Sequence, residues 1–294
     1  MFAARPPAQS PARRDLHLAR AAHRTFTGPA EFLADAANRA RVGEYLADMA
    51  RPHGRQVPVA LFGDQPSAEL GHSYGEMAKA LIESAVPADE PVDLLILAFS
   101  VHDLWPGRPA AGYLSHLTPG APLAFAVCDQ GSAAAFTGLR IAREYAASAG
   151  VGRALLIAVE QAALPYDCPV PLPAQHRGVA LLYSDSATER ARVADVRQHP
   201  AVAPGDVAAL AAADLKEMTA GRDDAGLVLG EGLATLWTTP AAGRVRVAPP
   251  GQPTTGVWCE LVDELDGDIS GLDLLVAADY DPDLRYLSLT ALAL

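Results

Sequence analysis

The chain has 294 residues, 50% hydrophobic and 20% charged, a balance typical of a folded protein with one large domain or two fused halves. Its formal net charge is -12. Nucleic acids and anionic membranes bind basic surfaces, so neither is an expected partner. No run of about 18 apolar residues predicts a membrane span. The three cysteines, Cys128, Cys168 and Cys259, have no CxxC spacing, which predicts reduced thiols in a cytoplasmic protein. The His and Cys residues are scattered without the spacing of metal ligands, so no metal site is predicted.

The segment before residue 25 is rich in Arg and Pro, whereas the remainder of the chain is acidic. We therefore expect residues 1–24 to form an N-terminal arm rather than part of the core. Apolar residues at three-to-four spacing then predict helices over residues 29–49 and 74–84. Short apolar runs predict strands over residues 56–62 and 92–98, and a loop leads on to a short helix at residues 112–117.

Residues 124–145, AFAVCDQGSAAAFTGLRIAREY, carry the strongest functional signal. The apolar start predicts the end of a buried strand, the letters CDQGS predict a tight turn, and a helix begins at or just after Ser132. Gly131 accepts backbone angles that other residues resist, so Ser132 can stand at the tip of the turn. The free N–H groups of the helix start favour negative charge there. Two interpretations stay open: Ser132 is a nucleophile, or it is only a helix N-cap.

The rest of the chain continues to alternate strands and helices. Strands are predicted at residues 153–160, 178–183, 226–229, 244–247, 272–278 and 285–290, and helices at residues 207–218 and 255–265. Four prolines within residues 165–173 predict a loop, and a tight turn is expected at residues 279–283. This alternation predicts an α/β architecture with a mixed sheet.

The turn and its helix resemble the nucleophile segment of the thiolase superfamily, in particular ketoacyl-synthase III and the chalcone-synthase-like enzymes. The likeness rests on Gln130-Gly131-Ser132 and on Leu139 and Ala142 further along the helix. The family carries Cys at the tip, where this chain carries Ser132. The resemblance implies a thiolase-like five-layered αβαβα sandwich of two similar halves, here residues 25–184 and a shortened second half at residues 185–294. It also implies a dimer formed through the strands beside the nucleophile helix.

The catalytic set that the resemblance implies is incomplete. Family condensing enzymes use a His and an Asn from the second half to polarise the extender thioester, and backbone N–H groups hold the oxyanion. All eight His lie at or before His199, and the expected positions read Gly230-Glu231-Gly232 and Gly251-Gln252. The candidate oxyanion or pocket residues are Gln130, Gly131 and Gly251.

Other side chains near the turn are weaker candidates. His176 could serve as a base, but it is more typical of an exposed loop residue, and Glu160 and Glu231 are similarly weak candidates. Cys128 lies on the strand side of the turn and is interpreted as buried and inert. A missing base costs about 10²–10⁴-fold in rate and a missing oxyanion donor about 10²–10³-fold more. Whether the chain is an enzyme at all is therefore an open question at this point.

Three functional hypotheses follow. The first is a catalytically degenerate partner subunit of an active, Cys-bearing ketosynthase in polyketide- or fatty-acid-type secondary metabolism, as a homodimer or heterodimer that also meets an acyl carrier protein. The second is a Ser-dependent acyltransferase that moves an acyl group between coenzyme A and a carrier protein or small acceptor. Its substrate would be an acyl-CoA or acyl-carrier-protein thioester, and no permanently bound cofactor is expected. The third is a binding module unrelated to acyl chemistry.

Overall fold

The computed structural model describes residues 14–55, 57, 70–105, 109–164, 171–222, 224–238 and 243–294. Except for residue 57, the predicted strand at residues 56–62 lies outside the described residues. So does the first part of the proline-rich loop, which includes Cys168.

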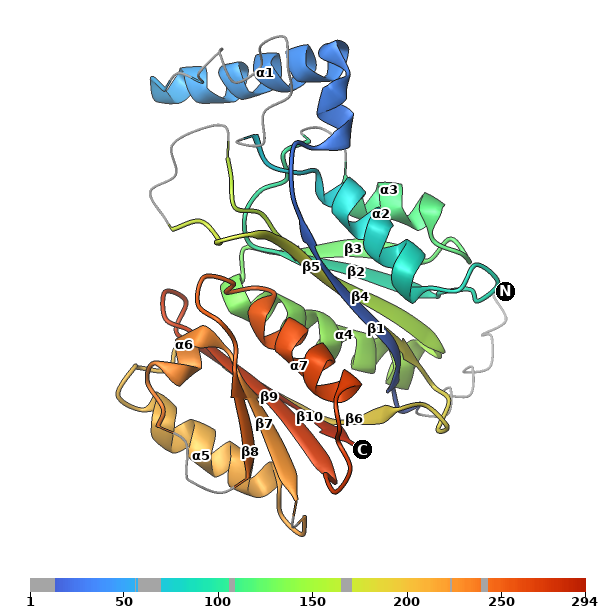
Figure 1. The fold of residues 1–294 in the computed structure, drawn as a ribbon, viewed down its shortest axis with the longest axis vertical. Coiled ribbons are helices and arrows are strands. Elements are labelled where there is room, and N and C mark those ends of the chain that lie inside the picture. Colours follow the sequence, from blue (N-terminus) through green and yellow to red (C-terminus); the bar gives the residue numbers. More distant parts are fainter. Residues whose placement is uncertain are drawn as a thin grey trace, which may run out of the picture.

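The strands of the described residues form two sets of five with the same connectivity (Figure 1). The first set has the spatial order β3-β2-β4-β5-β1 and comprises β1 (His17–Phe26), β2 (Leu94–Phe99), β3 (Leu123–Cys128), β4 (Arg153–Glu160) and β5 (His176–Ser184). The second has the order β8-β7-β9-β10-β6 and comprises β6 (Ala191–His199), β7 (Ala225–Leu229), β8 (Arg244–Val247), β9 (Leu274–Asp281) and β10 (Tyr286–Ala293).

Strand directions repeat between the sets as well. In each set the second strand runs parallel to the third and fourth, and the fifth runs antiparallel to the fourth and first. β1 and β6 join the two sets through only two residue pairs, His17 with Arg192 and Leu18 with Ala191. The fold is therefore a duplicated unit joined at the first strands of its halves.

The helices divide into three layers around these strands. α2 (Tyr74–Ala85) and α3 (Ala110–Leu117) pack on the outer face of the first set. α5 (Val207–Met218) and α6 (Glu231–Ala234) pack on the outer face of the second. α4 (Ala134–Ala149) and α7 (Gly256–Asp266) lie side by side between the sheets (Figure 1). The predicted five-layered αβαβα sandwich is thus confirmed.

Small residues allow α4 to lie close to the first sheet. A Cβ at Gly138 would stand 2.7 Å from Leu156 Cδ1, so a larger residue there would force the Leu156 side chain to move. Phe136 of α4 meets Trp258 of α7 with ring centroids 4.6 Å apart, and both side chains are fully buried. The central layer is therefore a dry contact between one helix from each half, and it holds the starts of both helices in place.

The structure corrects several predictions. Residues 17–24, expected in an arm, form most of β1, and β6 and α6 were not predicted at all. The helix predicted at residues 29–49 is two elements, η1 (Glu31–Ala34) and α1 (Ala36–Ala50). Asp35 separates them because its carboxylate accepts the N–H of Ala37 as the N-cap of α1. A short 3-10 turn, η2 (Arg51–His53), follows α1.

Candidate functional site

Ser132 lies at a strand-to-helix elbow, as predicted. β3 ends at Cys128, Asp129 and Gly131 take positive φ angles of 60° and 51°, and the 3-10 turn η5 (Gly131–Ala133) leads into α4. Ser132 is 4% exposed. Neither η5 nor α4 has a side-chain cap hydrogen bond, so the N-cap interpretation of Ser132 is wrong.

The backbone of the elbow is held by a carboxylate from the other half of the molecule. Asp281, the last residue of β9, accepts the N–H of Ser132 at Oδ2, 3.0 Å away. Its Oδ1 accepts the N–H groups of Asp283 and Leu284, at 3.1 and 2.9 Å. A Cβ at Gly131 would overlap Asp281 Oδ2, so this contact requires glycine there in addition to the positive φ.

A second carboxyl group of β9, that of Asp279, lies beside the Ser132 side chain, which acts to lower its pKa. Asp279 is 2% exposed, and its Oδ1 accepts the N–H groups of Tyr280, at 2.8 Å, and Leu233, at 3.3 Å. Burial raises the pKa of Asp279 to about 7, and the charge of nearby Asp281 adds to the rise while these hydrogen bonds oppose it. Ser132 therefore contacts two buried carboxyl groups from the second half.

In the segment after β7, where the family has its His, this chain has Gly230-Glu231-Gly232. A Cβ at Gly230 would overlap the Asp279 carboxyl group, and one at Gly232 would overlap the carbonyl oxygen of Tyr280. Between these glycines, Glu231 Oε2 accepts the N–H of Gly251 at 2.7 Å. Within the described parts of the chain no histidine hydrogen bonds to Ser132. Glycines after β7 thus make room for the Asp279 carboxyl group.

The remaining predicted pocket residues are occupied by local contacts. The Gln130 side-chain oxygen accepts the Thr137 hydroxyl at 2.6 Å, along α4. Gly251 has a φ of 88° and its carbonyl accepts the N–H of Ala174 at 2.7 Å. Beside it, Gln252 Nε2 donates to the Gly251 and Gln175 carbonyls, at 2.6 and 3.3 Å. These contacts leave neither Gln130 nor Gly251 aimed at the Ser132 hydroxyl.

The Glu160 side chain supports the start of α7. It is fully buried at the end of β4, where it accepts the N–H groups of Thr254 and Thr255 at 2.9 and 3.1 Å, and also the Thr255 hydroxyl. Burial raises the pKa of Glu160 to about 7, while these hydrogen bonds and Arg177 act in the opposite direction.

His176 begins β5 and is half-buried, so its expected place in an exposed loop is wrong. Its ring lies 4.7 Å from that of His72, and its Nδ1 accepts the N–H of Ala162 at 3.1 Å. Burial, with a contribution from His72, lowers the pKa of His176 to about 4. Cys128 is exposed on β3 rather than buried, and a raised pKa of its thiol disfavours the reactive thiolate.

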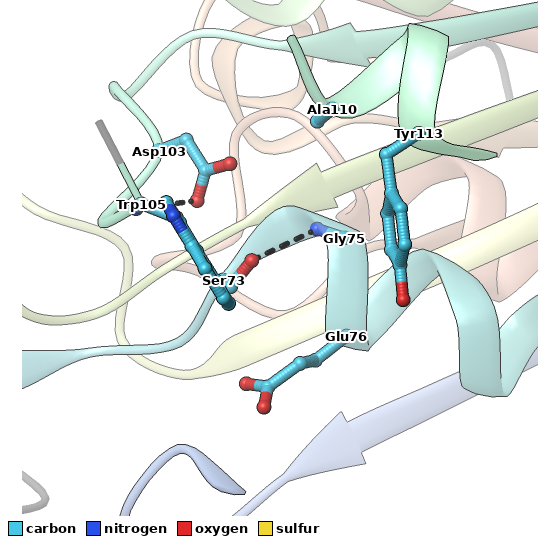
Figure 2. A pocket seen from close by; sticks show the side chains of 7 residues that line it. All are labelled: Ser73, Gly75, Glu76, Asp103, Trp105, Ala110 and Tyr113. Atoms are coloured by element: carbon cyan, nitrogen blue, oxygen red, sulfur yellow. Dashed lines mark hydrogen bonds between the residues drawn. The ribbon is translucent and has the colours of Figure 1, made fainter. Parts of the chain in front are cut away.

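A small cavity lies at the start of α2, apart from Ser132 (Figure 2). Its volume is about 30 Å³, room for one or two waters but not for an acyl chain. Figure 2 shows Ser73 bonded to the N–H of Gly75, as the α2 N-cap, and Asp103 bonded to the N–H of Trp105. Ser73 and Asp103 therefore have structural roles in this part of the chain.

The described residues offer neither a metal site nor a membrane-spanning helix. They contain no group of three or more His, Cys, Asp or Glu placed to hold a metal ion. They also contain no helix with the length and apolar character needed to cross a bilayer.

Known proteins were compared with the chain in sequence and in structure. No family model and no curated protein sequence matches it. Solved structures match over nearly its whole length. AbyA1, a tetronic acid condensing enzyme, gives a TM-score of 0.64 at 15% identity, covering 95% of this chain and 99% of AbyA1. An OleA variant from Xanthomonas campestris with bound lauric acid and lauroyl-CoA gives 0.63 at 13% identity, with 96% and 100% coverage.

A third match is 3-oxoacyl-(acyl carrier protein) synthase III, FabH, from Pseudomonas aeruginosa PAO1, with a TM-score of 0.59 at 14% identity and coverage of 95% and 98%. The chain has the ketoacyl-synthase III-like fold. The resemblance seen in the sequence is thereby confirmed at the level of the fold, and Ser132 lies at the elbow that the resemblance predicted. The ketoacyl-synthase III-like fold alone does not fix the chemistry, so the function is argued from the contacts of Ser132.

Proposed function

We propose that this chain is a ketoacyl-synthase III-like subunit without condensing activity. One observation carries the proposal: the Asp281 carboxylate accepts the N–H of Ser132 at 3.0 Å. In acyl transfer, donors at the nucleophile face the carbonyl oxygen that becomes negative. Here a carboxylate already binds that donor, and a second negative oxygen beside it would be repelled.

Neighbouring groups strengthen this argument. Gln252, beside the position where the family has its Asn, directs its Nε2 donor to two backbone carbonyls. Asp279 and Glu231 bring further carboxyl groups to the segments around the elbow. The site therefore presents acceptors where a condensing enzyme needs donors, and it is a poor place for an oxyanion.

We further propose that the chain pairs, as a homodimer or a heterodimer with a Cys-bearing homologue, in cytoplasmic polyketide- or fatty-acid-type secondary metabolism. β3 ends the strand order of the first half, and Leu123 on it is 55% exposed. An apolar strand edge favours pairing with another chain. The neighbours support acyl thioesters as the partner's substrates, since OleA was solved with lauroyl-CoA, and an acyl carrier protein is a suitable donor.

A second candidate function has one specific observation in its favour. The Asp279 carboxyl group lies beside the Ser132 side chain, where a general base would stand, so a Ser-dependent acyltransferase between coenzyme A and a carrier protein or small acceptor is the alternative.

Intact-mass measurement separates the two functions. The purified chain is incubated with acetyl-CoA, lauroyl-CoA or an acyl carrier protein carrying either group, beside Ser132→Ala as control. We expect no adduct on either protein. A stable adduct that disappears in S132A would establish the acyltransferase instead. The subunit role is tested by co-expression with a Cys-bearing homologue, and failure to co-purify, with a monomeric chain alone, would contradict it.

A further inference from the structure

The elbow places the Asp279 carboxyl group beside the Ser132 side chain and also holds the Asp281 carboxylate, which blocks the N–H of Ser132. Asp279 Oδ1 is held by the N–H groups of Tyr280 and Leu233, which fix the carboxyl group beside the Ser132 hydroxyl. A carboxyl group held beside a hydroxyl is placed to act as its base. Because Asp279 is 2% exposed, water does not compete for the contact.

The sequence around Asp279 accommodates this placement. Gly230 and Gly232 both lie where any side chain would overlap β9, at the Asp279 carboxyl group and at the Tyr280 carbonyl respectively. Two separate glycines therefore permit one carboxyl group to reach Ser132. A residue with a Cβ at either place would displace β9 from the elbow.

Asp281 acts on the same pair in two ways. Its Oδ2 binds the N–H of Ser132, so that donor cannot face a substrate carbonyl. Its negative charge, close to Asp279, also favours the protonated form of the Asp279 carboxyl group, which cannot act as a base. Asp281 is itself held by two N–H groups of the β9–β10 turn, so it is fixed in this position.

We infer that Ser132 and Asp279 form a latent nucleophile–base pair and that Asp281 keeps it idle. Removing the Asp281 carboxylate alone then makes Ser132 an acyl acceptor from a thioester. This inference rests on the proposed function, in which Ser132 of the native chain is not acylated. It adds that Ser132 is not acylated because of the Asp281 carboxylate, and not because the family's His and Asn are missing.

The step that this releases is an ordinary acyl transfer. Ser132 Oγ forms a bond to the thioester carbonyl carbon as its proton passes to the Asp279 carboxylate, and the freed N–H of Ser132 binds the carbonyl oxygen. The C–S bond then breaks, and Asp279 returns the proton to the leaving thiolate, which departs as a thiol. The products are an acyl ester on Ser132 and free coenzyme A.

Asp281→Ser is the decisive variant. A serine hydroxyl can still accept the N–H groups of the turn, but it is too short to reach the N–H of Ser132. The full chain is incubated with acetyl-CoA, whose small acyl group makes few demands on space, and is followed by intact mass and by release of free thiol. We expect a single acetyl adduct that forms at least about 10²-fold faster than on the native chain, as expected for a restored oxyanion donor.

Further variants show whether adduct formation in D281S depends on Ser132 and Asp279. D281S combined with Ser132→Ala, or with Asp279→Asn, is expected to give no adduct. Glu160→Gln, which changes the corresponding carboxylate of the other half, is expected to leave Ser132 as inert as in the native chain. Persistence of the adduct when Asp279 is Asn would overturn the role of Asp279 as base.

The remaining outcomes are also decisive. A folded D281S, judged by an unchanged circular dichroism spectrum, that forms no adduct would overturn the inference. If D281S does not fold, Asp281→Thr replaces it, because its hydroxyl also accepts the N–H groups of the turn, is too short to reach the N–H of Ser132, and stands on a side chain that suits a strand end, and the same criterion applies. If the native chain formed the adduct as fast as D281S does, native Ser132 would be an acyl acceptor. That result would refute the proposed function.

Discussion

Glu160 and Asp281 hold equivalent positions in the two halves, and each binds the start of the central helix of the opposite half. Glu160 ends β4 and accepts the N–H groups of Thr254 and Thr255, just before α7. Asp281 ends β9 and accepts the N–H of Ser132, just before α4. The repeat of strand order therefore extends to an exchange of carboxylates across the central layer. One of these contacts is purely structural, while the other falls on the candidate nucleophile.

Glu160→Ala is expected to destabilise the fold strongly. The fully buried carboxyl group receives two N–H groups and one hydroxyl, and alanine leaves these donors without partners. We expect the free energy of unfolding to fall by about 2–4 kcal/mol, measured by urea unfolding. Glu144→Ala, at an exposed site on α4, is the matched control and should change it by less than about 0.5 kcal/mol. Equal effects of the two substitutions would contradict the structural role of Glu160.

Stability is expected to rise as the pH falls from 8.5 to 6.5. The pKa values of Glu160 and Asp279 are about 7 in the folded chain, against ordinary values of 4.5 and 3.8. The folded state therefore takes up protons near pH 7 that the unfolded state does not, and the cost of burying the charges is largest above pH 7. We expect a gain of about 1 kcal/mol for each group over this range, seen as a higher melting temperature.

The variants Glu160→Gln and Asp279→Asn check this pH dependence one group at a time. Each should remove about half of the gain between pH 8.5 and 6.5, because an amide does not titrate there. His176 and His72 act in the opposite direction from about pH 7.5 downward, because their pKa values are lowered in the folded state and the unfolded state binds protons that the folded state does not. This histidine contribution is the same in the native chain and in both variants, so it cancels when each variant is compared with the native chain. An unchanged pH dependence in both variants would show that neither carboxyl group titrates near pH 7.

Much of the fold could be predicted because its signals are local. The apolar run of β4 predicted both ends of the strand, and the helical periodicity of α5 predicted both ends of the helix. β1 was missed because HLARAAHRTF mixes small and basic residues without clean alternation. Its place beside β5 depends on pairs such as His17 with Ser184, remote in sequence. No local pattern carries that information.

The elbow was predicted, but its contacts were not. Asp279, Tyr280 and Asp281 were assigned to a turn because Asp favours turns, whereas they end a buried strand. Their carboxyl groups are buried because their partners are N–H groups far along the chain, and Asp281 lies 149 residues from Ser132. A usable signal was present in the glycines after β7, whose lack of side chains makes the room that Asp279 needs.

Gly131→Ala is expected to disrupt the elbow. The residue has a φ of 51°, and its new Cβ would overlap Asp281 Oδ2. Gly54→Ala is a matched control, because Gly54 has a φ of 64° and nothing within 4 Å of the position of a Cβ. The control should cost about 1 kcal/mol of unfolding free energy, for the backbone angle alone, and G131A should cost at least about 2 kcal/mol more. If thermal unfolding gave the same loss for both, the close packing of Asp281 on the elbow would be wrong.

Leu123→Asp is expected to abolish the proposed subunit association. Leu123 lies on β3, the outer strand of the first half, and is 55% exposed. A buried, unpaired carboxylate at a strand-to-strand interface would weaken association by at least about 10²-fold. The duplicated fold supplies a control of the same kind, Val247→Asp on β8, which is 52% exposed on the equivalent edge of the second half. Sedimentation of both variants, alone and with a Cys-bearing homologue, should show loss of the dimer only for L123D. If V247D alone dissociates the dimer, association runs through the second half and not through the edge beside Ser132.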